Sequence, residues 1–140
     1  MTPLDDAEFR RWQDAAARAL AAAGVQRDAG YHEWACFLCE QGAQLAVKGL
    51  LHGLGLGAWG HDLGALVARV PSELEGWPQG HARAAERLAR FYIPTRYPDA
   101  VPGAIPGLRF DAEDSASALA DAGAILDAVE DGWRQLRAAP

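Results

Sequence analysis

The segment from about Tyr31 to His52 constrains the fold most, because it is apolar on nearly every side at helical spacing. A helix with one apolar stripe covers one face of a core, whereas a helix that is apolar all round needs neighbours on several sides. The residues that produce this profile are Trp34, Ala35, Phe37, Leu38, Leu45, Val47 and Leu50. The sequence therefore predicts a central helix, and the scarcity of Val and Ile elsewhere disfavours a sheet.

Two of the other predicted helices lie on either side of the central one in the sequence. The first has Thr2 as N-cap, Pro3 at the first helical position and Asp5 in the first turn, and Gly24 can end it. A short helix is predicted from His61-Asp62 to about Val70, after a Gly-rich loop.

The last two predicted helices are separated by a long loop with four prolines. One begins near Pro78 and runs to about Tyr92, where Pro94 stops it, and the other begins at the N-cap Asp111. The final helix spaces its apolar residues three and four apart, close to a coiled-coil seam. These residues are Leu119, Ala122, Leu126, Val129, Trp133 and Leu136. The five segments predict an all-α bundle with no linker wide enough for a second domain.

Charge and hydropathy exclude some classes of partner. The 140 residues carry a net charge of -6, which argues against broad binding to a nucleic-acid duplex but leaves room for a local basic site. No apolar run approaches the roughly 18 residues of a membrane span. The acidic N-terminus lacks the layout of a signal peptide. We expect a cytoplasmic protein with reduced thiols and no membrane contact.

The loop of residues 91–100 combines three aromatic residues, two prolines, Arg96 and Asp99. Pro94 and Pro98 restrict the backbone, so Arg96 and Asp99 are held on a stiff, extended segment that suits ligand binding. The alternative is a structural crossover in which the aromatic rings cover the core and Arg96 pairs with Asp99.

Two further strings have structural explanations. Residues 55–60 spell G-x-G-x-x-G, but the dinucleotide fingerprint needs a preceding strand, and here a helix precedes it. We expect these glycines to cap the second helix and turn the chain. His61 and Asp62 open the short helix, where capping is the ordinary role.

One helix face carries His32, Cys36 and Cys39, which are possible metal ligands. A structural zinc site needs four ligands, and only His52, His61 or Asp62 could complete this one. Because Cys commonly packs as a small hydrophobe, we expect packing rather than metal or any other cofactor.

Taken together, these features resemble the HEPN domain, a small helical fold named for nucleotide binding. The matching strings are Trp34-Ala35-Cys36-Phe37, Gln41, Lys48-Gly49-Leu50-Leu51, His61-Asp62-Leu63 and the loop string from Tyr92 to Ala100, which matches almost letter for letter. The resemblance covers about residues 4–131 and treats residues 1–140 as one domain. It implies an up-and-down four-helix bundle with an additional short helix. It also implies a homodimer paired with a small nucleotidyltransferase, often as a toxin–antitoxin module.

Many relatives are RNases that need no metal and use an Arg and a His with four to six residues between them. Here Arg96 is followed by Val101, Pro102 and Gly103 at those positions, so that His is missing. The family's Glu-Lys pair in the second helix is replaced by Gln44-Leu45. Arg27-x4-His32 fits the spacing, but it lies at the junction of the first two helices, away from the loop, and we interpret it as coincidence.

Metal-free RNA cleavage needs a base for the 2′-OH and a cation for the developing charge. Arg96 can supply the cation, and His61 is the remaining candidate for the base. Because the motif is incomplete, we favour binding of a nucleotide or RNA phosphate over catalysis. The rivals are an RNase toxin with an altered active site and a structural interaction module. The expected ligand-binding residues are Arg96, Tyr97, Asp99, Tyr92, His61 and Lys48.

Overall fold

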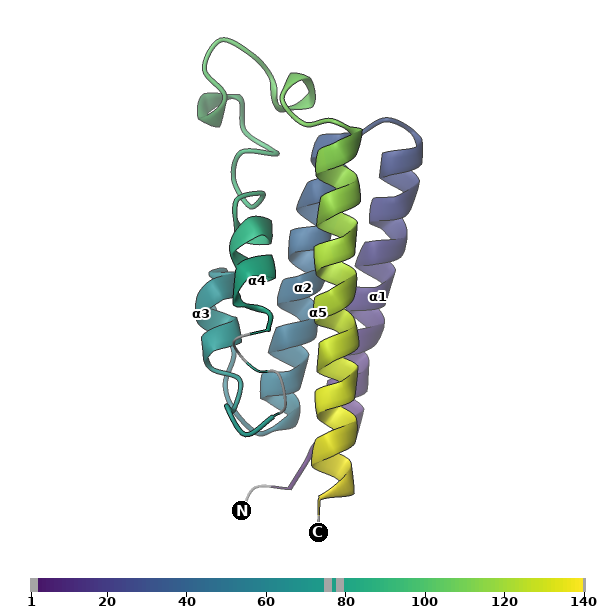
Figure 1. Ribbon diagram of the computed structural model, residues 1–140, viewed down its shortest axis with the longest axis vertical. Coiled ribbons are helices and arrows are strands. Elements are labelled where there is room, and N and C mark those ends of the chain that lie inside the picture. Colours follow the sequence, from purple (N-terminus) through teal and green to yellow (C-terminus); the bar gives the residue numbers. More distant parts are fainter. Residues whose placement is uncertain (1–2, 75–76, 78–79, 140) are drawn as a thin grey trace.

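The computed structural model describes residues 3–74, 77 and 80–139, and its regular elements are helices joined by loops (Figure 1). The described residues contain no strand, which confirms the all-α prediction. The helices are α1 (Asp6–Asp28), α2 (His32–Gly53), α3 (Leu63–Ala68), α4 (Ala82–Ala89) and α5 (Ala112–Ala138), with two 3₁₀ turns, η1 (Pro98–Ala100) and η2 (Pro106–Leu108).

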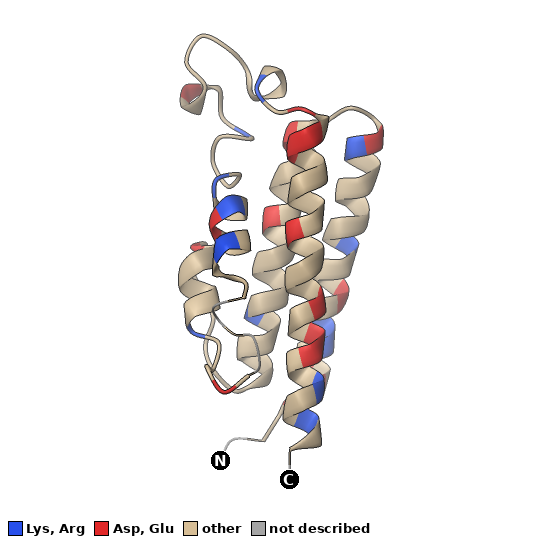
Figure 2. Cartoon of the chain, viewed as in Figure 1, with Lys and Arg blue, Asp and Glu red and all other residues tan. Residues whose placement is uncertain are grey.

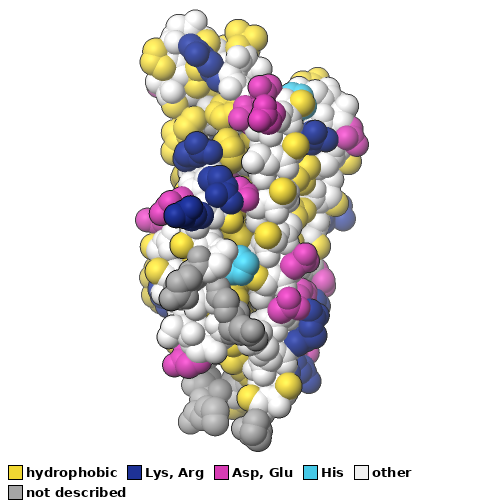
Figure 3. Space-filling view, in the orientation of Figure 1, with side chains coloured by type: hydrophobic (Ala, Val, Ile, Leu, Met, Phe, Trp, Pro, Cys, Tyr) yellow, Lys and Arg dark blue, Asp and Glu magenta, His cyan; other side chains and the backbone are white. Residues whose placement is uncertain are grey.

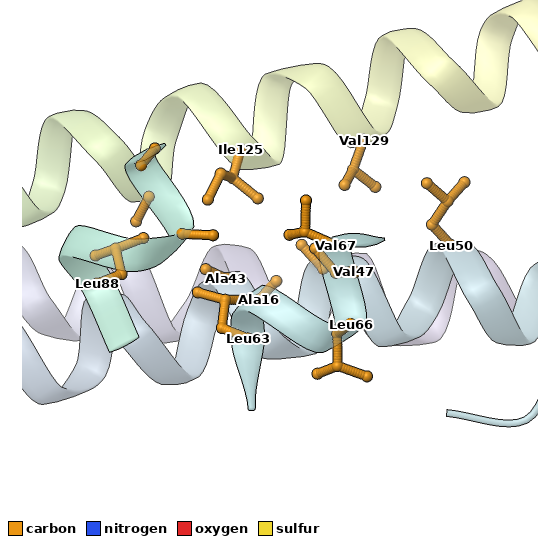
Figure 4. Packing of buried hydrophobic residues seen from close by; sticks show 14 of the residues in the cluster. Ala16, Ala43, Val47, Leu50, Leu63, Leu66, Val67, Leu88, Ile125 and Val129 are labelled. Atoms are coloured by element: carbon orange, nitrogen blue, oxygen red, sulfur yellow. The ribbon is translucent and has the colours of Figure 1, made fainter. Parts of the chain in front are cut away.

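Helix α2 occupies the centre of the bundle, as its apolar profile predicts. Helices α1 and α5 run along it, while α3 and α4 lie beside it on the other side (Figure 1). Thirteen of its 22 residues are buried, so only a narrow strip faces outward. In the core, Ile125 and Val129 of α5 point toward the side chains of α2 and α3, including Val47 and Val67 (Figure 4).

Glycines on α2 let α1 approach closely. A Cβ added at Gly49 would lie 2.7 Å from Nε2 of Gln13, which donates a hydrogen bond to the backbone oxygen of Ala46 at 2.9 Å. At the end of α2, the backbone nitrogen of Asp5 donates to the oxygen of Gly53 at 2.9 Å. The α1–α2 contact therefore depends on the absence of a side chain at position 49.

The first helix begins and ends later than its sequence signals indicate. Asp5 is the N-cap rather than a first-turn residue, because its side chain accepts from the backbone nitrogen of Glu8 at 3.0 Å. Thr2, the expected cap, lies outside the described residues. Gly24 stays helical, and the chain turns only at Gly30, whose φ of 87° is left-handed.

Other helix ends match the prediction more closely. Asp62 caps α3, and Asp111 forms a capping box with Asp114 at the start of α5. Helix α4 is shorter than predicted and ends before Tyr92, because the backbone nitrogens of Phe91 and Tyr92 bond to carbonyls only three residues back. Pro78, its predicted start, lies outside the described part of the chain, and α4 begins at Ala82.

The apolar seam of α5 packs inside the bundle. Ala122, Val129 and Trp133 are buried, and Trp133 stacks on Phe9 of α1 with 4.1 Å between ring centroids. The Trp133 indole also donates to Oδ1 of Asp6 at 2.7 Å. The coiled-coil spacing of α5 thus reflects packing against other helices of the same chain rather than an apolar face left exposed.

Residues 93–110 cross from α4 to α5 above one end of the bundle (Figure 1). The Gly-rich segment after α2 turns the chain as expected, with left-handed Gly55 and Gly60. Among the described helices, none combines the length and apolarity needed to cross a membrane.

We predict that Gly49→Ala destabilises the fold by about 1–3 kcal/mol, because the added methyl group must push α1 away from α2. Gly24→Ala is the matched control: it is also helical, but its added Cβ meets nothing within 4 Å. It should gain roughly 0.5–1 kcal/mol from helix propensity. Urea denaturation of both variants measures the difference, and equal stabilities would contradict the close packing at Gly49.

Candidate functional site

The loop that carries Arg96 is anchored just after α4. Thr95 is buried, and its hydroxyl donates to the backbone oxygen of Phe91 at 2.5 Å. The backbone nitrogen of Arg96 donates to the oxygen of Ile93 at 3.1 Å. With Pro94 between these contacts, the backbone of the loop is fixed and Arg96 is directed back toward α2.

The guanidinium of Arg96 lies in a cage of three aromatic rings, which we call the Arg96 cage. Its central carbon is 4.4 Å from the ring centre of Phe37 on α2, 4.8 Å from that of Tyr92 and 4.9 Å from that of Tyr97. Its Nε and Nη2 donate to the backbone oxygen of Tyr92 at 2.9 and 2.6 Å. These contacts hold the side chain in one orientation.

Arg96 has no acidic partner at ion-pair distance among the residues the structure describes. The alternative in which Arg96 pairs with Asp99 is not formed, and Asp99 is exposed in η1. Within the same residues, Nη1 of Arg96 has no hydrogen-bond partner. The cage therefore holds a half-buried cation with unused donor groups.

A buried carboxyl group lies beside this region on α2. Glu40 is fully buried, with Oε1 accepting from Nε2 of Gln41 at 2.9 Å and Oε2 accepting from Nε2 of Gln44 at 2.6 Å. Burial raises the pKa of Glu40, while the two amides and the charges of Lys48 and Arg96 oppose that rise. Burial also lowers the pKa of Lys48, against the attraction of Glu40.

His61 reaches the same region from the start of α3. Its ring stacks on Tyr92, with centroids 5.3 Å apart and planes inclined by 16°. Its Nδ1 lies 3.3 Å from Oε1 of Gln44. Tyr92 thus contacts both His61 and Arg96, although the sequence could not show that the two were near each other.

The expected ligand-binding residues separate into two groups. Tyr92, Tyr97 and Arg96 form the cage, and His61 joins it through Tyr92. Lys48 lies beyond Glu40 on α2, and Asp99 is exposed in η1.

Sequence reasoning missed Phe37, Glu40 and Gln44 as members of the site. For Glu40 and Gln44, the sequence signal was a polar pair one helical turn apart inside an otherwise apolar helix. Buried polar groups of this kind need partners, and here the partners are one another and His61.

The possible metal face of α2 is part of the core. Cys36 and Cys39 are buried, and burial raises the pKa of both thiols to about 12, which leaves them protonated and poor ligands. The described residues contain no group of three or more potential ligands positioned for a metal ion.

Arg27 and His32 both lie within hydrogen-bond distance of the hydroxyl oxygen of Ser115. Arg27 Nε donates to the hydroxyl of Ser115 at 3.1 Å, and Nδ1 of His32 lies 2.9 Å from the same oxygen. Ser115 is fully buried at the start of α5. The Arg-x4-His spacing therefore joins the end of α1 to the starts of α2 and α5.

A second group of basic side chains lies along α4, at Arg83, Arg87 and Arg90 (Figures 2 and 3). Arg87 is paired with Asp121 of α5 at 2.8 Å. Acidic side chains dominate α5 in the same view. The surface is thus mixed in sign, which fits a local rather than a broad anion site.

Comparison with solved structures finds close relatives. TT1696 from Thermus thermophilus is 36% identical, with a TM-score of 0.85 over 89% of this chain and 97% of that chain. ST0689, described as an archaeal HEPN homologue, is 31% identical, with a TM-score of 0.71 over 93% of this chain and 97% of its own.

A HEPN domain protein from Thermotoga maritima is 26% identical, with a TM-score of 0.69 over 92% of this chain and 99% of that one. No curated protein matches the chain at a significant level. The sequence profile of the HEPN domain matches residues 9–132, which run from the first turn of α1 to the last turns of α5. The chain belongs to the HEPN domain family.

Proposed function

We propose that this chain is a dimeric binding module that holds a nucleotide or RNA phosphate at the Arg96 cage and works with a nucleotidyltransferase partner. The observation that carries the proposal is a half-buried guanidinium, fixed by three rings and a carbonyl, with no acidic partner in the described part of the chain. A partly desolvated cation with no carboxylate at ion-pair distance gains more from an anion than an exposed one does.

The rings around Arg96 add a second mode of recognition. Tyr97 is half exposed, and Trp34, which packs edge-on against Phe37, is 45% exposed. Exposed aromatic rings stack on nucleobases without strong preference for sequence. A phosphate on Arg96 with a base on Tyr97 is therefore the arrangement that these residues suit best.

The partner follows from family membership rather than from a contact in the chain. HEPN domains commonly pair with nucleotidyltransferases, and a toxin–antitoxin role belongs to the same proposal. An adjacent gene for a small nucleotidyltransferase would support it.

A homodimer needs a surface other than the seam of α5, which the core already occupies. The outward strip of α2 offers one. Leu45 lies there, beside a hollow of about 220 Å³ that is also lined by Arg11, Trp12 and Ala15 of α1. A two-fold pair would bring this strip against its own copy.

Replacing Arg96 tests the proposed ligand site. Arg96→Ala should weaken binding of a short RNA oligomer by roughly ten- to a hundredfold, the effect of losing a charge-assisted hydrogen bond. Arg83→Ala is the matched control, because it removes the same charge from exposed α4. Fluorescence anisotropy measures both affinities. If Arg96→Ala lowers the melting temperature by many degrees and leaves binding unchanged, Arg96 is a structural clamp only.

The oligomeric state is a separate prediction. Light scattering at micromolar concentration should give about twice the 15.0 kDa of one chain. Leu45→Glu should shift the population toward monomer, whereas Leu56→Glu, in the exposed loop after α2, should not. A clean monomer for the unaltered protein would reject the dimer.

The RNase alternative is favoured by one observation, that His61 and Arg96 both contact Tyr92. We nevertheless expect weak or absent cleavage, because a positioned general base typically contributes about 10²–10⁴-fold and the family's His is missing. The assay uses RNA in EDTA with the unaltered protein, Arg96→Ala and His61→Ala. Cleavage that leaves a 2′,3′-cyclic phosphate and is lost in both variants would make this protein an RNase instead.

A further inference from the structure

The side-chain amide of Gln44 connects the buried carboxyl group of Glu40 to the exposed ring of His61. Gln44 is itself 2% exposed, so its polar atoms have no ready access to water. Its Nε2 donates to Oε2 of Glu40 at 2.6 Å and to the backbone oxygen of His61 at 3.2 Å. Its Oε1 faces Nδ1 of His61 at 3.3 Å.

The chemistry of these groups permits one orientation of the amide. A carboxylate and a backbone carbonyl can only accept hydrogen bonds, so both must face the two N–H groups of Gln44. The amide oxygen is then the atom left for His61, and it too can only accept. Nδ1 of His61 must therefore carry a proton, and in the neutral ring Nε2 keeps its lone pair.

We propose that Glu40, acting through Gln44, is a positioning residue that sets the tautomer of His61 and presents Nε2 as a hydrogen-bond acceptor to the ligand. This inference rests on the proposed binding function of the Arg96 cage. Its ligand would carry a hydroxyl or amino donor near the phosphate that Arg96 holds. Parallel stacking on Tyr92 fixes the plane of the imidazole, and the tautomer then decides which nitrogen can accept.

A neutral Gln side chain at position 40 could not fix the orientation of the Gln44 amide in the same way. Gln has the same shape as Glu but offers both a donor and an acceptor. Only the 3.2 Å bond from Nε2 of Gln44 to the backbone oxygen of His61 would then oppose a rotation that turns the N–H groups of Gln44 toward Nδ1 of His61. Glu40 is fully buried, and Gln41 supplies a second donor to its carboxyl group. Burying a carboxyl group is costly unless it is well hydrogen-bonded, and this one is bonded by two amides, one of which is the Gln44 relay.

The tautomer can be read directly by long-range ¹H–¹⁵N correlation spectra of the imidazole rings at about pH 8.5, where imidazoles are largely neutral. His61→Phe identifies the His61 signals. The unaltered protein should show a protonated Nδ1 and an unprotonated Nε2. In Glu40→Gln and Gln44→Met, that pattern should be lost or become a mixture.

Gln41→Met is the matched control, because it also removes a donor to Glu40, whereas the hydrogen bonds to His61 come from Gln44. It should leave the tautomer unchanged, and melting temperatures confirm that each variant is folded. If Gln44→Met does not fold, Glu40→Gln decides the question alone. A His61 that carries its proton on Nε2 in the unaltered protein, or one whose pattern is the same in the folded relay variants, overturns the proposal.

Binding of a short RNA oligomer tests the consequence. Glu40→Gln and His61→Phe should each weaken binding by about three- to tenfold, the loss of one hydrogen bond. Unchanged affinity in a Glu40→Gln variant whose tautomer has switched would overturn the role of Nε2. Affinity that is indifferent to Arg96→Ala would instead reject the binding site, whatever the tautomer is.

Discussion

The burial of α2 on several sides is the constraint on which the rest of the structure depends. An apolar helix without neighbours would expose its whole surface, so α1, α5 and the α3–α4 pair must surround it. Gly49 allows α1 to approach, while Val47 meets the apolar residues of α3 and α5. The same burial forces the polar residues of α2 to find partners inside the protein. Glu40 and Gln44 find them in each other and in His61, and so the central helix builds one wall of the candidate site.

The site joins three parts of the chain that lie far apart in sequence. Helix α2 supplies Phe37 and the relay residues, the start of α3 supplies His61, and the loop after α4 supplies Tyr92 and Arg96. Tyr92 is the common element. Its ring stacks on His61 and lies against the guanidinium of Arg96, and its carbonyl oxygen accepts hydrogen bonds from that guanidinium. A cation, an acceptor nitrogen and exposed aromatic rings are the groups that a nucleotide phosphate, sugar and base would require. The bundle positions them without a metal ligand set among its described residues.

Much of this architecture could be predicted from local sequence signals. The all-round apolarity of residues 31–52, the N-cap at Asp111 and the prolines after Tyr92 each reflect short-range physics, and each appears in the fold. Helix ends were less predictable, since Asp5 rather than Thr2 supplies the cap of α1 and the helix continues past Gly24 to Asp28. The site was harder still. The loop string pointed to Arg96, but the contacts of Arg96 with Phe37 and of Tyr92 with His61 depend on how α2, α3 and the loop pack together, which no spacing encodes. The apolar seam of α5 is ambiguous for the same reason, because periodicity shows that a face is covered but not by which chain.

The central claim is that the Arg96 cage, and not the basic side chains of α4, receives the anion. Side-chain N–H signals of the arginines, followed by NMR during titration with a short RNA oligomer, test it most directly. The account predicts saturable shifts of the Arg96 Nε–H signal and of the Tyr97 ring, with Arg83 and Arg90 little changed. Shifts centred on Arg83 and Arg90, with Arg96 unaffected at saturation, would contradict it.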